Sequence, residues 1–393
     1  MKQQLETELL HNILKYWQEK VFDKASGQFI GKIDNDEIAH PEYLKASIIN
    51  ARILWTVAAA YRQFPNESYL QIMAKSYDIL IKDFWDPENG GIYWSIDGNN
   101  QPLDTKKQMY AQAFAIYALS EYYMAVGIEQ AKQLAISLFW ILERYGFDPE
   151  HGGYIEALSA DWKEVGDQRL SEKDMDTKKS MNTHLHILEA YTNLYRIWKD
   201  EDLKEKLQHT LEVFLDRIVD AKAASFNLFF DLDWTLKSEH RSFGHDIEGS
   251  WLIYEAAEVL GDEKLLKRSK KIAVAMAEQV LTNGTDTDGG IFYEGENGKI
   301  LDSDKHWWPQ AEAVVGFFNA WQLSGEEKFL NASVKTWELI DSKFVDHEHG
   351  EWYAIVNKEG VPYPNAKVDE WKCPYHNGRF CLELISRINK LRN

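Results

Sequence analysis

The sequence has few cysteines and no long apolar segment. Only Cys373 and Cys381 occur among 393 residues, and their spacing matches no metal-binding motif. So few thiols in so long a chain indicate reduced cysteines and a cytoplasmic protein. No run of about 20 apolar residues is present, so no membrane partner is expected. The first 20 residues predict an amphipathic helix with acidic residues inside it, rather than a signal peptide.

Basic residues are also scarce, while tryptophan and tyrosine are abundant. Lysine and arginine number 44 against 63 acidic residues, which gives a formal net charge of −19. Because nucleic-acid binding usually needs a basic face, a nucleic-acid partner is not expected. The chain contains 15 tryptophans and 19 tyrosines. Most large rings fill spaces between helices, but this enrichment in an acidic chain also favours a carbohydrate site, where rings pack on the C–H faces of sugars.

A turn motif recurs and divides the chain into similar units. An aspartate followed by glycine is typical of a tight turn, and the aromatic and β-branched residues after it predict a short strand. The motif has a looser first member near Phe22 and is degraded near Asp220. Its clearest copies are Asp86-Pro-Glu-Asn-Gly-Gly, Asp148-Pro-Glu-His-Gly-Gly, Thr287-Asp-Gly-Gly and Asp346-His-Glu-His-Gly.

Two predicted helices follow each turn. Residues 108–123 are apolar nearly all round, as in an enclosed helix, and residues 129–145 are amphipathic, as in an outer helix. This alternation predicts an all-α fold, an (α/α)6 barrel (toroid) of six helix pairs with short β-hairpin loops at one mouth, forming a single domain over residues 1–393. The predicted inner helices are 41–64, 108–123, 180–198, 245–260, 308–323 and 376–391. The outer ones are 2–21, 67–84, 129–145, 201–218, 263–281 and 328–344.

Polar residues recur in the predicted inner helices about every 60–70 residues. In a ring of equivalent helices, such residues meet in one shared cavity near the helix N-termini. His184 is expected to point away from that cavity, because it lies between Asn182 and His186, which share a helix face. The recurring residues are Arg52, Gln112, Asn182 with His186, His245 with Glu248, Glu312, and His376.

Three histidines with two glutamates and an arginine fit proton abstraction next to a carbonyl group. That reaction needs a base with a pKa near 7, an acid to return the proton, and groups that stabilise an enediolate oxygen. No metal is expected, because the sequence shows neither a helical pair of zinc-binding histidines nor an obvious cage of carboxylates. Two alternatives stay open. Glu248 and Glu312 could hydrolyse a glycoside, or the ring could bind sugars or proteins without catalysis.

Five segments resemble the cellobiose 2-epimerase group of the N-acylglucosamine 2-epimerase superfamily, whose members are (α/α)6 barrels. Together they are specific, although each alone is weak, and the resemblance covers essentially the whole chain. The segments are RILWTVAAAYR (52–62), KSMNTHLHILEAY (179–191), GHDIEGSWLIYEAA (244–257), KHWWPQAEAVVGFFNA (305–320) and DEWKCPYHNGRFCLEL (369–384).

The resemblance implies an isomerase that inverts carbon 2 of the reducing-end glucose in a β-1,4-linked disaccharide such as cellobiose or lactose. It implies that His245 and His376 are the general acid and base, and that His186 assists ring opening or holds the intermediate. No cofactor is expected, since the carbonyl of the substrate is the electron sink. The implied sugar contacts are Arg52, Tyr110, Asn182, Glu248 and Glu312, with Trp308 and Trp371 as stacking platforms and Trp251 as a wall.

Three further expectations accompany the resemblance. Arg379 shares a helix face with His376 and joins the substrate-binding group, and Glu248 is expected to orient or charge His245. A monomer or a weak homodimer is expected. Mannose isomerases and N-acylglucosamine 2-epimerases of the same superfamily remain alternative activities.

Overall fold

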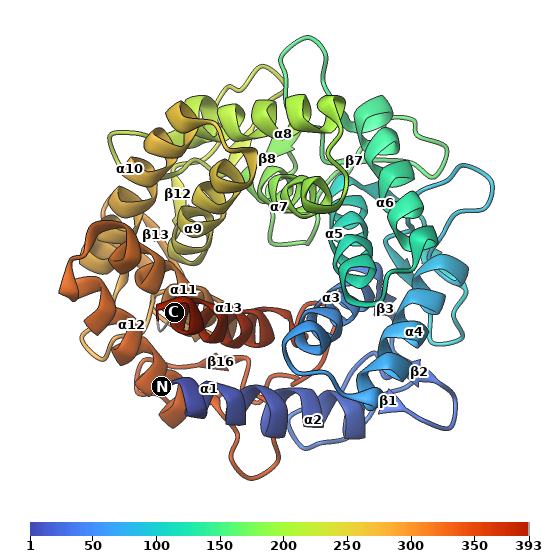
Figure 1. The fold of residues 1–393 in the computed structure, drawn as a ribbon, viewed down its shortest axis with the longest axis horizontal. Coiled ribbons are helices and arrows are strands. Elements are labelled where there is room, and N and C mark those ends of the chain that lie inside the picture. Colours follow the sequence, from blue (N-terminus) through green and yellow to red (C-terminus); the bar gives the residue numbers. More distant parts are fainter. Residues whose placement is uncertain (392–393) are drawn as a thin grey trace.

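The computed structural model describes residues 1–391 and consists of two concentric rings of helices (Figure 1). Consecutive inner helices contact one another around the ring, and the last inner helix closes it against the first. Across residues 1–391 the inner ring contains six helices. They are α3 (Ser47–Gln63), α5 (Met109–Val126), α7 (Met181–Ile197), α9 (Phe243–Leu260), α11 (Trp307–Ser324) and α13 (Tyr375–Leu391).

The outer ring alternates with the inner one, as the sequence predicts. The N-terminal segment, made of α1 (Lys2–Thr7), η1 (Glu8–Ile13), α2 (Leu14–Tyr16) and η2 (Trp17–Val21), packs beside α13 and completes the outer ring. The other outer helices are α4 (Glu67–Lys82), α6 (Glu129–Ile141), α8 (Glu201–Val213), α10 (Glu263–Gln279) and α12 (Glu327–Leu339). All but α4 continue into one π-helical turn: η3 (Leu142–Gly146), η4 (Phe214–Ile218), η5 (Val280–Gly284) and η6 (Ile340–Phe344).

Short antiparallel sheets gather at the mouth where the inner helices begin. The strands β3, β6, β8, β12 and β15 each lead directly into an inner helix. The sheets are β1–β2, β3–β4–β5, β6–β7, β8–β11, β9–β10, β12–β13–β14 and β15–β16. Their strands are β1 (Phe22–Asp23), β2 (Gln28–Phe29), β3 (Lys45–Ala46), β4 (Ser95–Ile96), β5 (Pro102–Asp104), β6 (Lys107–Gln108), β7 (Ala157–Leu158), β8 (Lys179–Ser180), β9 (Val219–Asp220), β10 (Ser225–Phe226), β11 (Phe229–Phe230), β12 (His240–Ser242), β13 (Glu294–Glu296), β14 (Lys299–Asp302), β15 (Lys305–His306) and β16 (Ile355–Val356).

Two details of the sequence prediction are wrong. The first inner helix begins at Ser47 rather than at residue 41, because Lys45 and Ala46 pair with β4 as a strand. The turn at Asp220 is retained rather than degraded. The Asp220 carboxylate accepts hydrogen bonds from two backbone N–H groups of its turn, and Ala224 adopts φ +51°, so the motif survives without its glycine.

Burial explains the contrast between inner and outer helices. The helix α5 is buried from Met109 to Tyr122 because neighbouring helices cover it on all sides. The outer helix α8 buries one stripe, which includes Leu203, Leu207 and Leu211. Over residues 1–391, the structure contains no helix with both the length and the apolar character needed to cross a membrane.

Before four of the inner helices, a basic residue two positions ahead of the helix pairs with the aspartate of a recurring turn and fastens that turn to the ring. Lys179 illustrates the arrangement: its ammonium group lies 2.7 Å from the Asp148 carboxylate and donates to the carbonyl oxygens of Gly152 and Leu232. This signal was overlooked in the sequence, although it is visible there as a repeated basic position. The four basic residues are Lys107, Lys179, Arg241 and Lys305, and their partners are Asp86, Asp148, Asp220 and Asp286.

Replacing Lys179 with methionine is expected to destabilise the protein by about 3–5 kcal/mol, because it leaves the Asp148 carboxylate buried without its cation. Urea unfolding followed by circular dichroism measures the loss. The matched control is Lys106→Met, since Lys106 is only partly buried and lies 3.9 Å from Asp104. A loss equal to that of the control would contradict the anchoring role.

The same pair predicts how the loss depends on pH. Burial raises the pKa of Asp148, but the Lys179 ammonium and two turn N–H groups outweigh it, and the folded-state pKa is lowered. The pair therefore stabilises the fold above the unfolded pKa, about 4, and this contribution is lost as pH falls through the lowered folded value. We expect one cooperative transition for the whole chain, because no helix pair buries its apolar face alone.

Candidate active site

The inner helices present their polar side chains in a shared register. Counted from each helix start, the sixth residue is Arg52 in α3, His186 in α7, Glu248 in α9 and Glu312 in α11. One turn nearer the mouth, the second residue is Tyr110 in α5, Asn182 in α7 and Trp308 in α11. Because all inner helices begin at the same mouth, these positions form two levels around the ring axis.

The fourth residue of the same helices has a different task. In α5 the Gln112 side chain accepts a hydrogen bond from the Ile92 backbone N–H at 2.7 Å and donates one to the Ile92 carbonyl oxygen at 2.8 Å. In α7 His184 accepts the backbone N–H of Tyr154 at 2.8 Å. His184 therefore points away from the cavity, as the sequence predicts. The expectation that Gln112 belongs to the polar cluster is wrong, because its side chain fastens a hairpin.

His376 forms a short contact with Glu312. Its Nδ1 atom lies 2.6 Å from Glu312 Oε1, and the Trp251 indole N–H donates to the other carboxylate oxygen at 3.2 Å. Burial lowers the pKa of His376 well below its ordinary value, and the positive charge of Arg52 lowers it further. With Nδ1 engaged by a carboxylate, the remaining ring nitrogen is free to exchange a proton.

His245 sits at the rim beside an aromatic ring. It is half-buried, its Nδ1 atom lies 2.8 Å from the Ser242 hydroxyl, and its ring centre lies 4.7 Å from that of Trp308. Burial lowers the pKa of His245 to about 3, with a smaller contribution from His186. The expected pairing with Glu248 does not occur, because the Arg379 guanidinium reaches Glu248 from α13.

His186 and Arg52 meet on an aromatic wall. His186 packs against the Tyr110 and Phe114 rings, with centroid separations of 4.9 and 4.5 Å. Arg52 donates to the Tyr110 hydroxyl at 2.8 Å and stacks over Phe114 at 4.3 Å. Within residues 1–391 the Arg52 guanidinium forms no ion pair, so its positive charge remains available to an oxygen anion.

Arg379 binds three carboxylates beneath this cluster. Its guanidinium donates to Glu189, Glu248 and Glu312. Burial and the nearby Glu312 carboxylate together raise the pKa of Glu248 to about 7, although the charge of Arg379 opposes both effects. Arg379 and Trp251 are each only 1% exposed. They are as deeply buried as Glu248 and Glu312, and their roles as sugar contacts stay predictions.

The same carboxylates raise the question of a metal ion. One ligand atom each from Glu248, Glu312 and His376 lies within 4.8 Å of the others, a donor set that would suit a divalent cation. No local sequence pattern indicates this donor set, because its three residues come from different helices. Arg379 donates to both carboxylates, and its guanidinium already supplies the positive charge there. A metal ion at this position would have to displace that side chain.

Aromatic rings and one amide form the rim of the cluster. Trp308 lies against both His245 and His376. Trp371 is half-buried, and its ring centre lies 5.9 Å from that of Trp94, a residue that the sequence did not single out. Asn182 is also half-buried, and its amide oxygen has no partner within the described chain. The rim thus offers flat apolar faces beside an unused hydrogen-bond acceptor.

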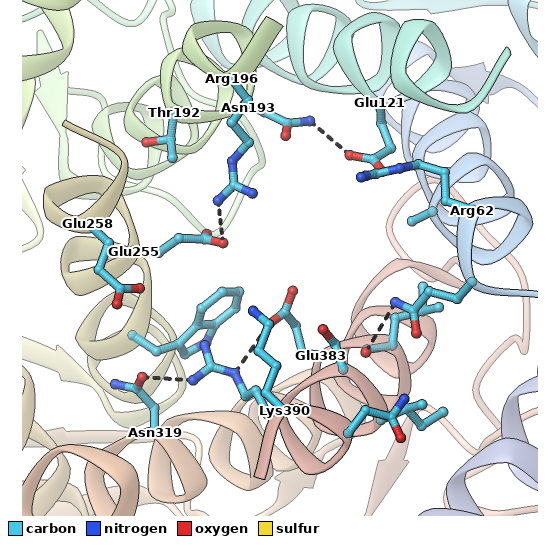
Figure 2. A pocket seen from close by; sticks show the side chains of 18 of the residues that line it. Arg62, Glu121, Thr192, Asn193, Arg196, Glu255, Glu258, Asn319, Glu383 and Lys390 are labelled. Carbon is cyan, nitrogen blue, oxygen red and sulfur yellow. Dashed lines mark hydrogen bonds and ion pairs between the residues drawn. The ribbon is translucent and has the colours of Figure 1, made fainter. Parts of the chain in front are cut away.

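A cavity of about 950 Å3 opens at the opposite mouth of the ring, where the inner helices end. Figure 2 shows its charged side chains pairing across neighbouring helices, Arg62 with Glu121 and Arg196 with Glu255, at 2.5 and 2.8 Å. These charges satisfy one another and fasten α3 to α5 and α7 to α9. The imidazoles and the unpaired arginine lie at the other end, so we place the candidate chemistry there. Trp251 and Glu189 line this far-mouth cavity from above.

Comparison with known proteins shows the family and the fold of the chain. The family model for N-acylglucosamine 2-epimerase (GlcNAc 2-epimerase) matches residues 27–378. The cellobiose 2-epimerase of Bacteroides fragilis is 46% identical over 392 residues, covering 98% of each chain. The solved structure of cellobiose 2-epimerase from Bacillus thermoamylovorans superposes with a TM-score of 0.93 at 39% identity, covering 98% of this chain and 99% of the other. The D-mannose isomerase of Marinomonas mediterranea is 22% identical, over 92% of each chain.

Proposed function

The chain belongs to the N-acylglucosamine 2-epimerase family, and from this we propose that it epimerises carbon 2 of the reducing-end glucose in β-1,4-linked disaccharides. Cellobiose would give 4-O-β-glucosyl-mannose, and lactose would give epilactose. The observation that carries the proposal is that His245 and His376 both contact the Trp308 ring. A sugar stacked on that ring would lie between two imidazoles. The choice of a disaccharide rests on three relatives, at 46, 39 and 35% identity, that are named cellobiose 2-epimerases.

The reaction begins by opening the sugar ring to the free aldehyde. We assign the transfer of the ring-oxygen proton to His186, which lies against Tyr110 on the wall that holds Arg52. Asn182 lies one turn closer to the mouth on the same helix face and supplies an amide to a sugar hydroxyl. The open-chain aldehyde makes the proton on carbon 2 acidic enough for a histidine to remove.

One of His245 and His376 removes the proton from carbon 2, and a cis-enediolate forms. The Arg52 guanidinium and the Tyr110 hydroxyl stabilise the developing oxyanion. The proton then returns to the opposite face, from the other histidine or after rotation about the carbon 2–carbon 3 bond, and the ring closes as mannose. No cofactor takes part, because the electrons of the broken C–H bond are held by the carbonyl of the substrate. Glu312 orients His376 through its contact with Nδ1, and Glu248 balances the charge of Arg379.

Replacing Trp371 with alanine is expected to raise KM for cellobiose roughly 5- to 10-fold, while mannose conversion changes much less. The physical reason is that Trp371 would stack on the second sugar, which a monosaccharide lacks. Steady-state kinetics on both sugars measures the effect. Trp140→Ala is the control, since Trp140 lies on the outer helix α6 and is 45% exposed. An equal loss on both sugars would make Trp371 a packing residue.

A proton NMR time course of cellobiose with EDTA-treated protein in D2O tests the proposed function. We expect 4-O-β-glucosyl-mannose carrying deuterium at carbon 2, as metal-free proton transfer through exchangeable histidines requires. Release of free glucose would instead assign the protein to glycoside hydrolysis. Conversion of only mannose or N-acetylglucosamine would assign it to one of the monosaccharide branches of the family. Saturable sugar binding without turnover would identify a non-catalytic sugar-binding ring.

We also propose that the protein works in the cytoplasm as a monomer or weak homodimer. Cys373 and Cys381 are both buried free thiols, which suits a reducing compartment. Light scattering during gel filtration measures the mass in solution against the 45.7 kDa of one chain.

A further inference from the structure

Glu189 joins His186 to the far side of the ring. It lies on α7, three residues after His186, and its Oε2 atom is 2.9 Å from His186 Nδ1. Its other oxygen accepts a hydrogen bond from the Tyr375 hydroxyl at 2.5 Å and another from Arg379. Both partners come from α13. A carboxylate buried at 3% exposure thus holds one imidazole and two groups of another helix in fixed places.

The charge of Glu189 determines which ring nitrogen of His186 carries the hydrogen. Burial raises the pKa of Glu189, but Arg379 and His186 outweigh burial and lower it to about 2. The group is therefore an ionised carboxylate, which accepts hydrogen bonds and donates none. His186 must supply the hydrogen through Nδ1. The other nitrogen, Nε2, is then the unprotonated one and can accept a proton.

We propose that Glu189 is a positioning residue for the epimerisation: it holds the proton of His186 on Nδ1 and presents Nε2 to the oxygen of the sugar ring. The inference rests on the proposed function for its kinetic consequences. A carboxylate behind a catalytic imidazole fixes the tautomer and the ring plane, and it stabilises the imidazolium that forms during proton transfer. The parallel within the same site is Glu312, which contacts His376 Nδ1 at 2.6 Å.

The location of Glu189 allows a clean test, because this residue lines the far-mouth cavity rather than the proposed sugar site. Glutamine at this position has nearly the same shape but carries no charge. Its carbonyl oxygen can satisfy Tyr375 or Arg379, and its NH2 group then faces His186 and favours the opposite tautomer. The matched control is Glu258→Gln, which removes a carboxylate from the same cavity at a position on α9 outside the His186 contact network.

The experiment combines 15N NMR of the histidine rings with kinetics. In the wild type we expect the His186 signal of the Nδ1–H form, identified by its loss in His186→Asn. In Glu189→Gln we expect the Nε2–H form, and a fall in kcat of roughly 10²–10⁴-fold with KM changed less than about threefold. Glu189→Asp restores the charge at a longer distance and is expected to regain at least roughly tenfold of the kcat lost in the glutamine variant. The Glu258→Gln variant is expected to match the wild type in both readouts.

An unchanged His186 tautomer in Glu189→Gln would overturn the inference, whatever happens to turnover. Activity that falls only in step with the folded fraction would reduce Glu189 to a structural link between α7 and α13. If the wild type converts no sugar, the proposed function fails. The NMR comparison then still decides whether Glu189 sets the His186 tautomer.

Discussion

Asparagine in place of His376 or His245 is expected to lower kcat for cellobiose by roughly 10²–10⁴-fold or more and to leave folding intact. Each substitution removes a group that accepts or returns the carbon 2 proton, while the amide fills much of the same space. Initial rates in saturating cellobiose, with thermal unfolding run in parallel, measure both effects. His347→Asn is the matched control, because His347 lies in an exposed hairpin turn away from the cluster.

Near-normal turnover in either variant would remove that histidine from the mechanism. Loss of deuterium incorporation at carbon 2 should accompany the loss of rate, since both report the same proton transfer. The pH profile adds an independent check. The pKa of His245 is lowered to about 3 and that of His376 is also lowered, so both imidazoles stay unprotonated as pH falls through 6.5. An acid limb near pH 7 in kcat/KM would instead report Glu248, whose pKa is about 7, and Glu248→Gln should abolish it.

Replacing Arg52 with methionine is expected to lower kcat roughly 10²–10³-fold, because the enediolate oxygen loses its positively charged donor in a buried site. Arg52 is 4% exposed and has no ion-pair partner among residues 1–391, so its charge has no other evident use. Kinetics on cellobiose should show the loss mainly in kcat. The control is Arg62→Met, about three turns further along α3, where the arginine pairs with Glu121 at the far mouth.

A loss confined to KM would contradict this role for Arg52. It would mean that Arg52 binds the sugar equally in the ground state and in the transition state, and that another group stabilises the oxyanion. Tyr110 is then the next candidate, since its hydroxyl already receives a hydrogen bond from Arg52 and lies on the same wall.

The amino-acid sequence alone determined the alternation of enclosed and amphipathic helices, and with it the ring. An outer helix buries one face and is therefore amphipathic, whereas an inner helix is enclosed and is apolar on nearly all sides. It also showed that the three histidines and two glutamates recur at similar places in successive helix pairs. His184 and His186, two positions apart, show how much helix geometry predicts about the direction of a side chain. Residues two positions apart on a helix point about 200° apart, so His184 and His186 cannot both face the ring centre. Because His186 shares a helix face with the polar Asn182, the sequence predicted that His184 is the one that points away, and the structure confirms this for His184.

Only the tertiary structure decided which charges meet. Glu189 and Arg379 are 190 residues apart in the chain, and they touch because α7 and α13 face each other across the ring and both side chains point inward (Figure 1). The position of α13 also explains why Glu248 accepts a hydrogen bond from Arg379 and does not pair with His245. The start of each helix also fixed the register that sends Gln112 to a hairpin and His186 to the site. Local patterning determines each helix and its buried face, whereas the partners of a buried charge depend on distances between helices that no local pattern contains.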